Sequence, residues 1–395
     1  MYTEQDLVAI AKRENNKKRA YLVVDPLQGK HVPVSPKPAL GVFRELAEKI
    51  KQNYRGERLL LVGFAETATA IGAACAVYNE CYYMQTTREE VAGVTYFYFS
   101  EAHSHATEQR LAENDLDEVI KKIDRLVFVE DEVTTGNTIL NIIRLIRKRY
   151  DFPVRFGVAS LLNGMDDAAR RVYEEQQIPL QYLVKTDHSG YTAVADGYRG
   201  DGTYIDCTDQ AVDTVQTAGE SKILPVFGYQ NTRRLVNAKN YQNACESLWQ
   251  QIAEKIKSEA EKSCRILVLG TEEFMYPALY VASKLEECAM RAPAKTEREE
   301  KEVRFHATTR SPIAVSSEEG YPLQTRYRLA SFYDEARVTY IYDLAAYDKI
   351  YIITDAKEGR AGADALVRAL RIAGNSTEDI TIFRWTKQET DGGQS

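Results

Sequence analysis

The sequence predicts an α/β fold made of two related parallel-sheet domains. Short, continuous apolar runs alternate with segments of helical periodicity along the chain. The landmarks of the first half return in the same order in the second half. The chain has 395 residues, which exceeds the roughly 100 to 200 residues of an average domain. We therefore predict one domain over residues 1–215 and another over residues 216–395, joined near residues 210–222.

The first half begins the strand and helix alternation of a parallel sheet. Apolar runs such as LLLVGF are typical of strands that are buried on both faces. The predicted strands span residues 20–24, 59–64, 82–86, 126–130 and 154–162, and the predicted helices span 40–51, 69–77 and 138–150. The last helix places isoleucines on one face and basic residues at the end that the helix dipole favours: Ile139, Ile142, Ile143, Ile146, Arg147, Lys148 and Arg149.

The second half repeats the landmarks of the first. Each copy of one pentapeptide is followed by an apolar strand, LLLVGF in the first half and ILVLGT in the second. The shared order favours two related domains, and the alternative is chance reuse of common strand and helix patterns. The paired landmarks are AEKIK at 47–51 and 253–257, TTR at 86–88 and 308–310, and EDEVTTGNT at 130–138 with the looser TDAKEGRAG at 354–362.

Composition and charge exclude several classes of protein. The net charge of -7 argues against broad nucleic-acid binding, which needs a basic face. No apolar run approaches the roughly 20 residues of a membrane span, and the charged N-terminus lacks the apolar core of a secretion signal. The six cysteines have no CxxC spacing, so neither a disulfide framework nor a zinc site is indicated. We expect a cytoplasmic protein.

Residues 126–138, LVFVEDEVTTGNT, carry the chemistry. A strand delivers two acids, Glu130 and Asp131, at its carboxyl end, where open α/β sheets bind their ligands. Adjacent carboxylates suit the vicinal hydroxyls of a ribose. The small residues that follow can direct backbone N–H groups at a phosphate ahead of a helix: Thr134, Thr135, Gly136, Asn137 and Thr138. The alternative is a strand-to-helix turn in which the acids cap the helix.

This segment resembles the signature of type I phosphoribosyltransferases, in which apolar residues precede two acids and a Thr-Gly-x-Thr ending. The resemblance implies that Glu130 and Asp131 hold the ribose hydroxyls of phosphoribosyl pyrophosphate, and that residues 134–138 bind its 5'-phosphate. It also implies Mg²⁺ as the cofactor, with the same two acids as metal ligands. Glu132 departs from the family, which has an apolar residue there. This charge could repel an anionic substrate, alter the acceptor or face solvent.

The resemblance assigns two further segments to the pyrophosphate. The loop within GFAETATAIG (63–72) corresponds to the family's pyrophosphate loop, with Gly63, Ala65, Glu66, Thr67 and Ala68 as candidates. Its alternative is an ordinary strand-to-helix turn. Arg88 could clamp the diphosphate, because a guanidinium fits phosphate oxygens bidentately, or it could be a surface arginine.

Residues 100–110, SEAHSHATEQR, lie where the family has a mobile loop that closes over the reacting centre. By this resemblance His103 or His105 donates to the departing pyrophosphate, and a solvated loop histidine is the alternative. A zinc cluster of Glu101, His103 and His105 is disfavoured because no fourth ligand is nearby.

The whole chain is similar to a narrower family, in which such a domain precedes a domain named for its Thr-Arg-Ser-Pro motif. Thr309 to Pro312 spell this motif. Such proteins are associated with bacterial tellurite-resistance and stress gene clusters and with nucleoside-like biosynthesis. The second domain would be a diverged phosphoribosyltransferase-like fold, since TDAKEGRAG keeps only Asp355 of the acid pair and adds Lys357 and Arg360. It would bind a phosphate or nucleotide, or serve as a structural or dimerising partner.

The function predicted on this basis is transfer of phosphoribosyl from phosphoribosyl pyrophosphate to a small nitrogenous acceptor. A non-catalytic sensor of phosphoribosyl pyrophosphate or nucleotides is the alternative, because fold alone does not separate the two. Scaffolding of a biosynthetic complex is a third. The acceptor and the oligomeric state, a homodimer included, stay open, since the candidate acceptor residues follow no pattern: Lys30, His31, Lys185, Asp187 and His188.

Overall fold

The computed structural model describes residues 2–14, 19–99, 109–208, 222–260, 263–291, 301–357 and 359–387. It divides into two compact units that interleave along the sequence. The first unit contains Met1–Glu4, Leu40–Asp187 and Gln230–Asn243, and the second contains Gln5–Ala39, His188–Tyr229 and Ala244–Ser395. The N-terminal segment therefore groups with the second unit. The domain boundary after residue 215 lies outside the described residues and stays a prediction.

The first unit is built on a six-stranded sheet with the strand order β12-β4-β3-β7-β8-β9. Within this sheet β4, β3, β7, β8 and β9 are mutually parallel, and only β12, at the edge, runs antiparallel to its neighbour. The strands are β3 (Leu59–Gly63), β4 (Tyr82–Gln85), β7 (Arg125–Val133), β8 (Arg155–Asn163), β9 (Leu180–Lys185) and β12 (Val236–Asn237). The predicted parallel α/β sheet is confirmed.

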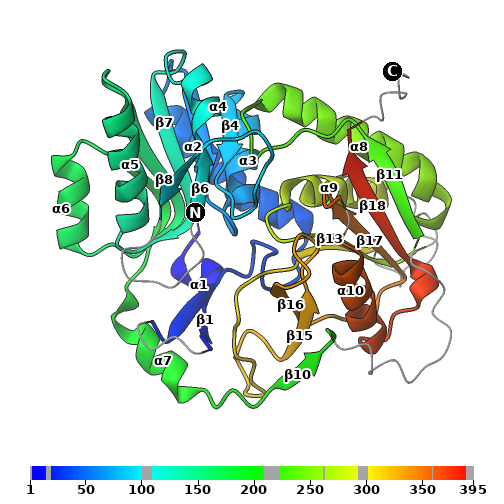
Figure 1. The fold of residues 1–395 in the computed structure, drawn as a ribbon. Helices are drawn as coiled ribbons and strands as arrows, with labels where there is room; N and C mark the ends of the chain where they lie inside the picture. Colours follow the sequence, from blue (N-terminus) through cyan, green and yellow to red (C-terminus); the bar gives the residue numbers. More distant parts are fainter. Residues whose placement is uncertain are drawn as a thin grey trace, which may run out of the picture. The chain divides into compact units, whose positions relative to one another are not determined.

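The helix predicted over residues 138–150 buries the apolar face that the sequence predicts. In α5 (Asn137–Arg149), which lies alongside β7 and β8 in Figure 1, all four predicted isoleucines are buried and the basic cluster fills the last turn. The remaining elements of this part of the chain are α2 (Pro36–Asn53), α3 (Thr69–Asn79), α4 (Glu113–Val119), α6 (Asp167–Glu175), and the hairpin of β5 (Tyr96–Phe99) and β6 (Gln109–Ala112).

The order of the strands defines where this sheet can bind a ligand. β3 comes first in the chain, β4 follows on one side of it, and β7 follows on the other side. This reversal makes a topological switch point between β3 and β7. Open α/β sheets bind ligands at such a point, outside the carboxyl ends of the strands. The segments that follow β3, β4 and β7 are therefore the candidates for a ligand site.

The second unit contains a five-stranded parallel sheet with the order β11-β18-β17-β13-β14. β13 has β14 on one side and β17 on the other, as β3 has β4 and β7. The strands are β11 (Lys222–Phe227), β13 (Arg265–Gly270), β14 (Glu302–Ala307), β17 (Lys349–Thr354) and β18 (Ile380–Thr386), and the helices include α8 (Ala238–Ala260), α9 (Tyr276–Arg291) and α10 (Arg360–Ile372). A second parallel sheet, as predicted, is confirmed.

One predicted element is wrong in its role. The strand near residues 20–24 exists as β2 (Tyr21–Val24), but it does not start the parallel sheet. It pairs antiparallel with β1 (Ala9–Lys12) in a separate two-stranded sheet. The physical reason is a small core of the second unit, in which Ala11 and Val24 pack with residues distant in sequence: Ile313, Val315, Tyr321, Leu323 and Tyr342.

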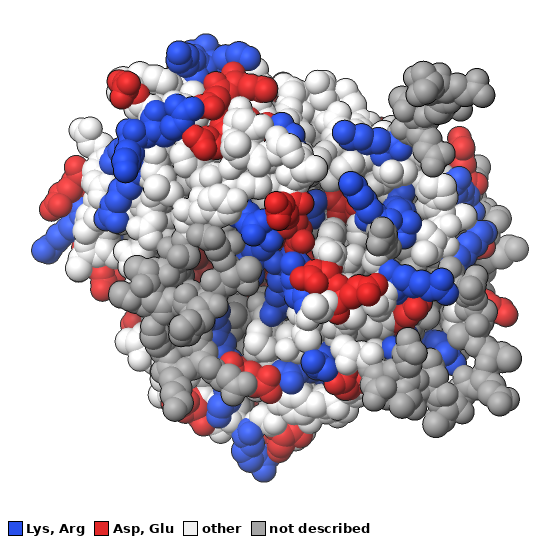
Figure 2. Space-filling model, viewed as in Figure 1, with Lys and Arg blue, Asp and Glu red and all other residues white. Residues whose placement is uncertain are grey.

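The second unit also contains short elements outside its five-stranded sheet. A three-stranded sheet has the order β10-β15-β16. The elements are α1 (Glu4–Leu7), α7 (Tyr191–Gly197), η1 (His188–Gly190), η3 (Thr377–Asp379), β10 (Thr203–Asp206), β15 (Thr325–Ala330) and β16 (Val338–Tyr342). Among the described helices, none has the length and apolar character needed to cross a membrane. On the face drawn in Figure 2, acidic and basic side chains are interspersed.

Candidate functional site

The two acids of the motif stand near the carboxyl end of β7. The strand predicted over residues 126–130 is longer than expected, because it continues through the acids to Val133. β8 extends equally far and keeps pairing with β7, with Glu130 opposite Ser160 and Val133 opposite Asn163. Glu130, Asp131 and Glu132 are all partly exposed. The sheet therefore presents the carboxylates on a hydrogen-bonded strand, which fixes their position better than a free turn would.

The loop after β7 turns through Gly136 into α5. Gly136 is the N-cap of the helix and has a φ of 68°, a left-handed conformation that favours glycine. A Cβ at this position would lie 2.3 Å from the Tyr173 hydroxyl oxygen and 2.6 Å from the Met165 Cε. The Tyr173 hydroxyl donates to the Gly136 carbonyl at 2.7 Å. The Tyr173 contact thus holds the loop on its buried side, whereas the side chains of Thr135 and Asn137 are exposed.

Tyr173 stays a donor because its proton is hard to remove. Burial raises the pKa of the Tyr173 phenol well above its ordinary value, and the negative charge of Glu130 raises it further. The neutral phenol can therefore hold the Gly136 carbonyl over the whole physiological pH range.

The loop after β3 lies beside the acids. Gly63 pairs with Val129 in the sheet, and the Phe64 N–H donates to the Val129 carbonyl at 3.0 Å. Ala65, Glu66 and Ala68 are buried, Thr67 is partly exposed, and the peptide bond between Ala65 and Glu66 is cis.

Two glycines let α3 approach this loop closely. A Cβ on Gly72 would lie 2.8 Å from the Gly63 Cα, and a Cβ on Gly63 would lie 2.9 Å from the Ala68 carbonyl oxygen. Any larger residue at either position would push the helix away from β3. The close approach therefore keeps residues 64–68 in a tight turn directly above the strand.

Arg88 follows the third strand of this group. β4 pairs with β3, with Gln85 opposite Gly63, and the Thr86 N–H donates to the Gly63 carbonyl at 2.9 Å. Arg88 lies three residues beyond the end of β4 and is partly exposed. The carboxyl ends of three adjacent parallel strands thus bring together Arg88, residues 64–68 and residues 130–138. Their roles as ligands of a substrate stay predictions.

His103, with Glu101 and His105, lies outside the described residues. The first described residue after them, Gln109, makes contacts that the sequence did not predict. Its side chain joins Ala65 and Thr86. No motif marks this glutamine, because its partners are distant in sequence and only the folded sheet brings them together. The candidates Lys185 and Asp187 end or follow β9, whereas Lys30, His31 and His188 belong to the second unit.

The donors of this site suit Mg²⁺. Carboxylate oxygens such as those of Glu130 and Asp131 are the protein ligands Mg²⁺ prefers, and Mg²⁺ is usually held by one or two carboxylates together with substrate phosphates. Within the described part of the chain, no group of three or more His, Cys, Asp or Glu side chains could hold a metal by itself. The acid pair therefore fits a metal that arrives with a phosphate-bearing substrate.

The second unit repeats the backbone geometry of this switch point. The Thr308 N–H donates to the Gly270 carbonyl at 3.2 Å, as Thr86 does to Gly63. The Glu272 N–H donates to the Thr308 hydroxyl oxygen at 3.0 Å, and the Ala65 N–H donates to the Thr86 hydroxyl oxygen at 2.8 Å.

The helix entry is repeated as well. Gly359 is the N-cap of α10 with a φ of 69°, close to the 68° of Gly136 at the start of α5. The TTR and TDAKEGRAG landmarks thus occupy places in the second sheet that correspond to those of TTR and EDEVTTGNT in the first.

The side chains at the second switch point pair with one another. Glu272 is fully buried, and its carboxylate accepts from Arg310 Nε at 2.7 Å and from Ser331 Oγ. Arg337 approaches the same carboxylate at 3.4 Å. Asp355, the acid retained from the pair, accepts from the hydroxyls of Tyr229 and Tyr333, at 2.6 Å each. Glu272, Arg310 and Asp355 are thus engaged within the protein.

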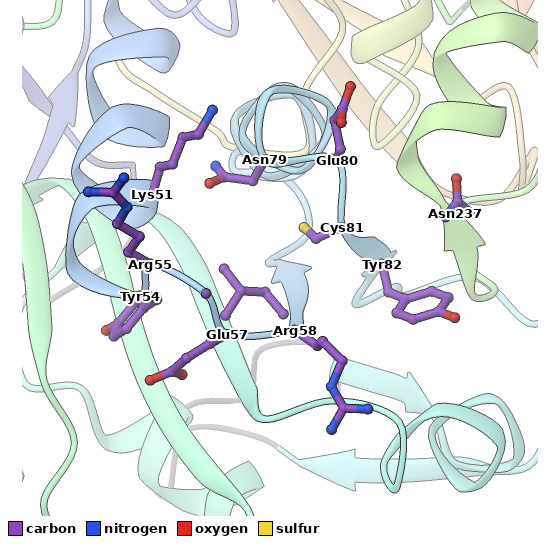
Figure 3. A pocket seen from close by; sticks show the side chains of 12 residues that line it. Lys51, Tyr54, Arg55, Glu57, Arg58, Asn79, Glu80, Cys81, Tyr82 and Asn237 are labelled. Carbon is purple, nitrogen blue, oxygen red and sulfur yellow. The ribbon is translucent and has the colours of Figure 1, made fainter.

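A groove of about 400 Å³ lies at the other end of the strands of the first sheet, away from the switch point. Figure 3 shows that its lining comes from the end of α2, the turn before β3, the end of α3 and the start of β4. The groove therefore borders the amino ends of β3 and β4. Two of its charged residues are already paired, Arg58 with Asp124 at 3.0 Å and Glu57 with Arg125 at 2.8 Å. The groove is therefore separate from the switch point.

Comparisons with known proteins agree with the sequence motifs. A family model described as a phosphoribosyl transferase matches residues 7–189, and one described as the TRSP domain C terminus to PRTase_2 matches residues 231–370. No curated protein is significantly similar in sequence.

Two solved structures illustrate the structural similarity. The adenine phosphoribosyltransferase of Rhodothermus marinus is 14% identical over 46% of this chain and 96% of its own, with a TM-score of 0.34. The enzyme of Giardia lamblia, complexed with 9-deazaadenine, is 13% identical over 47% and 96%, with a TM-score of 0.35.

Proposed function

Given that the chain belongs to the proteins that join a phosphoribosyltransferase domain to a C-terminal TRSP domain, we propose that it transfers phosphoribosyl from phosphoribosyl pyrophosphate to a small nitrogenous acceptor. The observation that supports the proposal is that two segments lie next to each other at the switch point. The acid pair of β7 and the loop after β3 adjoin through the pairing of Gly63 with Val129. A sugar held by the first thus presents its diphosphate to the second.

The sugar end of the substrate would bind along β7 and the start of α5. Glu130 and Asp131 would accept hydrogen bonds from the ribose hydroxyls, and residues 134–138 would donate backbone and hydroxyl hydrogens to the 5'-phosphate. The left-handed Gly136 and its bond from Tyr173 support this role, because they hold the loop that would meet the phosphate. The grip positions C1' of the ribose without any nucleophile from the protein.

The leaving group would bind on β3 and β4. The backbone of residues 64–68 and the guanidinium of Arg88 would stabilise negative charge as it grows on the departing pyrophosphate. Mg²⁺, when bound, supplies additional positive charge beside the diphosphate. The reacting ribose passes through an oxocarbenium-like state, so catalysis consists of positioning and charge stabilisation. One such site per chain is proposed, because the retained acid of the second switch point, Asp355, and the nearby Glu272 are both engaged by other side chains of the protein.

Replacing one acid tests the proposal. Asp131→Asn should reduce turnover at least about 100-fold by weakening the hold on the ribose, while the fold persists. Turnover is measured by mass spectrometry of products after the protein is incubated with phosphoribosyl pyrophosphate, Mg²⁺ and cell extract. Asp167→Asn, an exposed acid on α6, serves as the control and should behave as the unmodified protein. Equal rates in all three proteins would contradict the assignment.

A ligand sensor is the second candidate, and one measurement separates it from the enzyme. Pyrophosphate release on mixing with phosphoribosyl pyrophosphate and a panel of bases supports transfer. Binding of phosphoribosyl pyrophosphate without release supports a sensor. The family resemblance adds a role in a stress response, with a nucleoside-like product made in the cytoplasm, to the first candidate. Accumulation of that product in cells, and its loss with Asp131→Asn, would support this role.

A further inference from the structure

A closed ring of side-chain hydrogen bonds fixes the loop after β3. The Ala65 N–H donates to Thr86 Oγ1 at 2.8 Å, the Thr86 hydroxyl donates to Gln109 Oε1 at 2.7 Å, and Gln109 Nε2 donates to the Ala65 carbonyl at 2.6 Å. Ala65 thus has both its N–H and its carbonyl held. These two groups belong to the peptide units on either side of it, so the ring sets the plane of both.

The chemistry of glutamine explains why this residue can close the ring. Its amide carries an acceptor and a donor on one planar group. Thr86 can give its single hydroxyl hydrogen to the Gln109 oxygen and still accept from the Ala65 N–H. Only the amide orientation with Nε2 toward the Ala65 carbonyl satisfies all three contacts. A carboxylate or an aliphatic side chain of the same length would lose at least one of them.

Strand alternation aims Gln109 at the loop. Successive residues of a strand point to opposite faces. The next residue, Arg110, stacks over the rings of Tyr96 and Tyr98, with its guanidinium carbon 5.9 and 5.6 Å from their centroids. The backbone of Arg110 is tied to Thr87 by two hydrogen bonds of 2.9 Å each. β6 is therefore anchored beside the end of β4 with Gln109 facing inward.

The second unit contains an independent version of the same clamp. Glu272 corresponds to Ala65, and its N–H donates to Thr308 Oγ1. Its carbonyl accepts from the buried Lys30 Nζ at 2.8 Å, and that amine also donates to the Thr308 carbonyl at 2.9 Å. A side-chain nitrogen from a distant segment thus holds the same carbonyl in both units. This recurrence indicates that the loop needs an external donor to keep its shape.

We propose that Gln109 is a positioning residue of the first site, which with Thr86 holds the backbone of residues 65–66 in the orientation that receives the diphosphate. The inference rests on the proposed function for the identity of the anion. The clamp itself is a property of the protein alone. Gln109 touches neither the ribose grip nor residues 134–138 in the contacts described, so its loss should affect one end of the substrate selectively.

Two ligands separate this role from a general effect on the fold. Phosphoribosyl pyrophosphate would use both halves of the site, whereas ribose 5-phosphate would use only the acids and residues 134–138. Calorimetric titration of each ligand, with Mg²⁺, is carried out on the full chain and on Gln109→Met and Thr86→Val. Both variants should bind phosphoribosyl pyrophosphate about tenfold more weakly and bind ribose 5-phosphate unchanged. Thr86→Ser keeps the hydroxyl and should bind phosphoribosyl pyrophosphate as the unmodified protein does. Gln52→Met, at an exposed glutamine of α2, is the matched control.

Hydrogen exchange of the ligand-free protein tests the clamp without any substrate. Gln109→Met and Thr86→Val should speed amide exchange over residues 64–68 and leave residues 134–140 unchanged. Unchanged exchange at residues 64–68, unchanged binding of phosphoribosyl pyrophosphate, or equal weakening of both ligands would each overturn the proposal. If the unmodified chain binds neither ligand, the proposed function fails, and the exchange result still decides the clamp.

Discussion

At the scale of single residues, Gly136 is a position where both the backbone conformation and the crowded surroundings require glycine. Its left-handed φ of 68° disfavours any side chain, and a Cβ would also collide with Tyr173 and Met165. Gly56 has a φ of 81°, but a Cβ added there would meet nothing within 4 Å. The two glycines therefore share the backbone demand and differ in crowding, which makes them a matched pair.

We predict that Gly136→Ala lowers the free energy of unfolding by about 2–5 kcal/mol, the sum of backbone strain and overpacking. Gly56→Ala should cost only about 1–2 kcal/mol, the backbone strain alone. Urea unfolding of both variants, followed by circular dichroism, measures the difference. Equal losses would show that the Tyr173 contact does not constrain the loop after β7.

His306 offers a residue-scale test by pH. It is fully buried, and burial lowers its pKa to about 4, helped by the nearby Lys30 charge. In the unfolded chain a histidine has a pKa of about 6.5. Between these values the unfolded state binds a proton that the folded state does not, so stability falls as the pH drops from 6.5 towards 4. Above pH 6.5 the histidine is neutral in both states and contributes no pH dependence.

The second unit should therefore lose about 2 kcal/mol of stability between pH 7 and pH 5 through His306. His306→Gln should lack this part of the loss. Fluorescence is a suitable readout, because both tryptophans, Trp249 and Trp385, belong to the second unit. If the variant and the unmodified protein lose the same stability over this range, the histidine is not the group that titrates.

At the scale of elements, the central strands and the helices of the first sheet were predictable because their signals are local. β3, β4, β7 and β8 appear within a few residues of their predicted ranges, and so do α3 and α5. Continuous apolar runs and a 3.6-residue period identify such elements wherever their partners lie. The motif acids were found for the same reason, since their spacing is contained in one segment.

The pairing of the short strands outside the two parallel sheets could not be predicted. β2 was predicted as a strand, but its antiparallel pairing with β1, and the hairpin of β5 and β6, are visible only in the folded chain. Gln109 lies 44 residues from Ala65, with which it bonds. The role of Arg310 was open for the same reason, because its counter-ion Glu272 lies 38 residues earlier and carries no motif.

The loops after β13 and β14 give an element-scale prediction, since Arg310 joins them through a buried ion pair. The Arg310 and Glu272 side chains are 8% and 0% exposed. Arg310→Met should cost about 3 kcal/mol, because it leaves a buried carboxylate with weaker partners. Arg199→Met removes an exposed pair with Glu318, whose side chains are 68% and 25% exposed, and should cost about 0–1 kcal/mol. Urea unfolding followed by tryptophan fluorescence compares them. Equal costs would leave the arginine of the Thr-Arg-Ser-Pro motif available for a ligand.

At the scale of the whole molecule, the two matched families do not coincide with the two compact units. The phosphoribosyl transferase model begins at residue 7, yet Gln5–Ala39 group with the second unit. Ala11 and Val24 pack in its small core, Val34 pairs with Phe305, and Lys30 holds the carbonyls of Glu272 and Thr308. The second unit therefore depends on the N-terminal segment, although the family model of the first domain covers most of that segment.

Deleting residues 1–39 should thus damage the second unit before the first. Without Ala11 and Val24 the small core opens, and without Lys30 two buried carbonyls lose their donor, which costs about 1–3 kcal/mol for each unsatisfied group. Hydrogen exchange should increase at β14 and β16, while β3, β7 and β8 stay protected, and the tryptophan emission should shift to the red. Adding a peptide of residues 1–39 should reverse these changes. Loss of protection at β3 and β7 with β14 unaffected would instead assign the N-terminal segment to the first unit in solution.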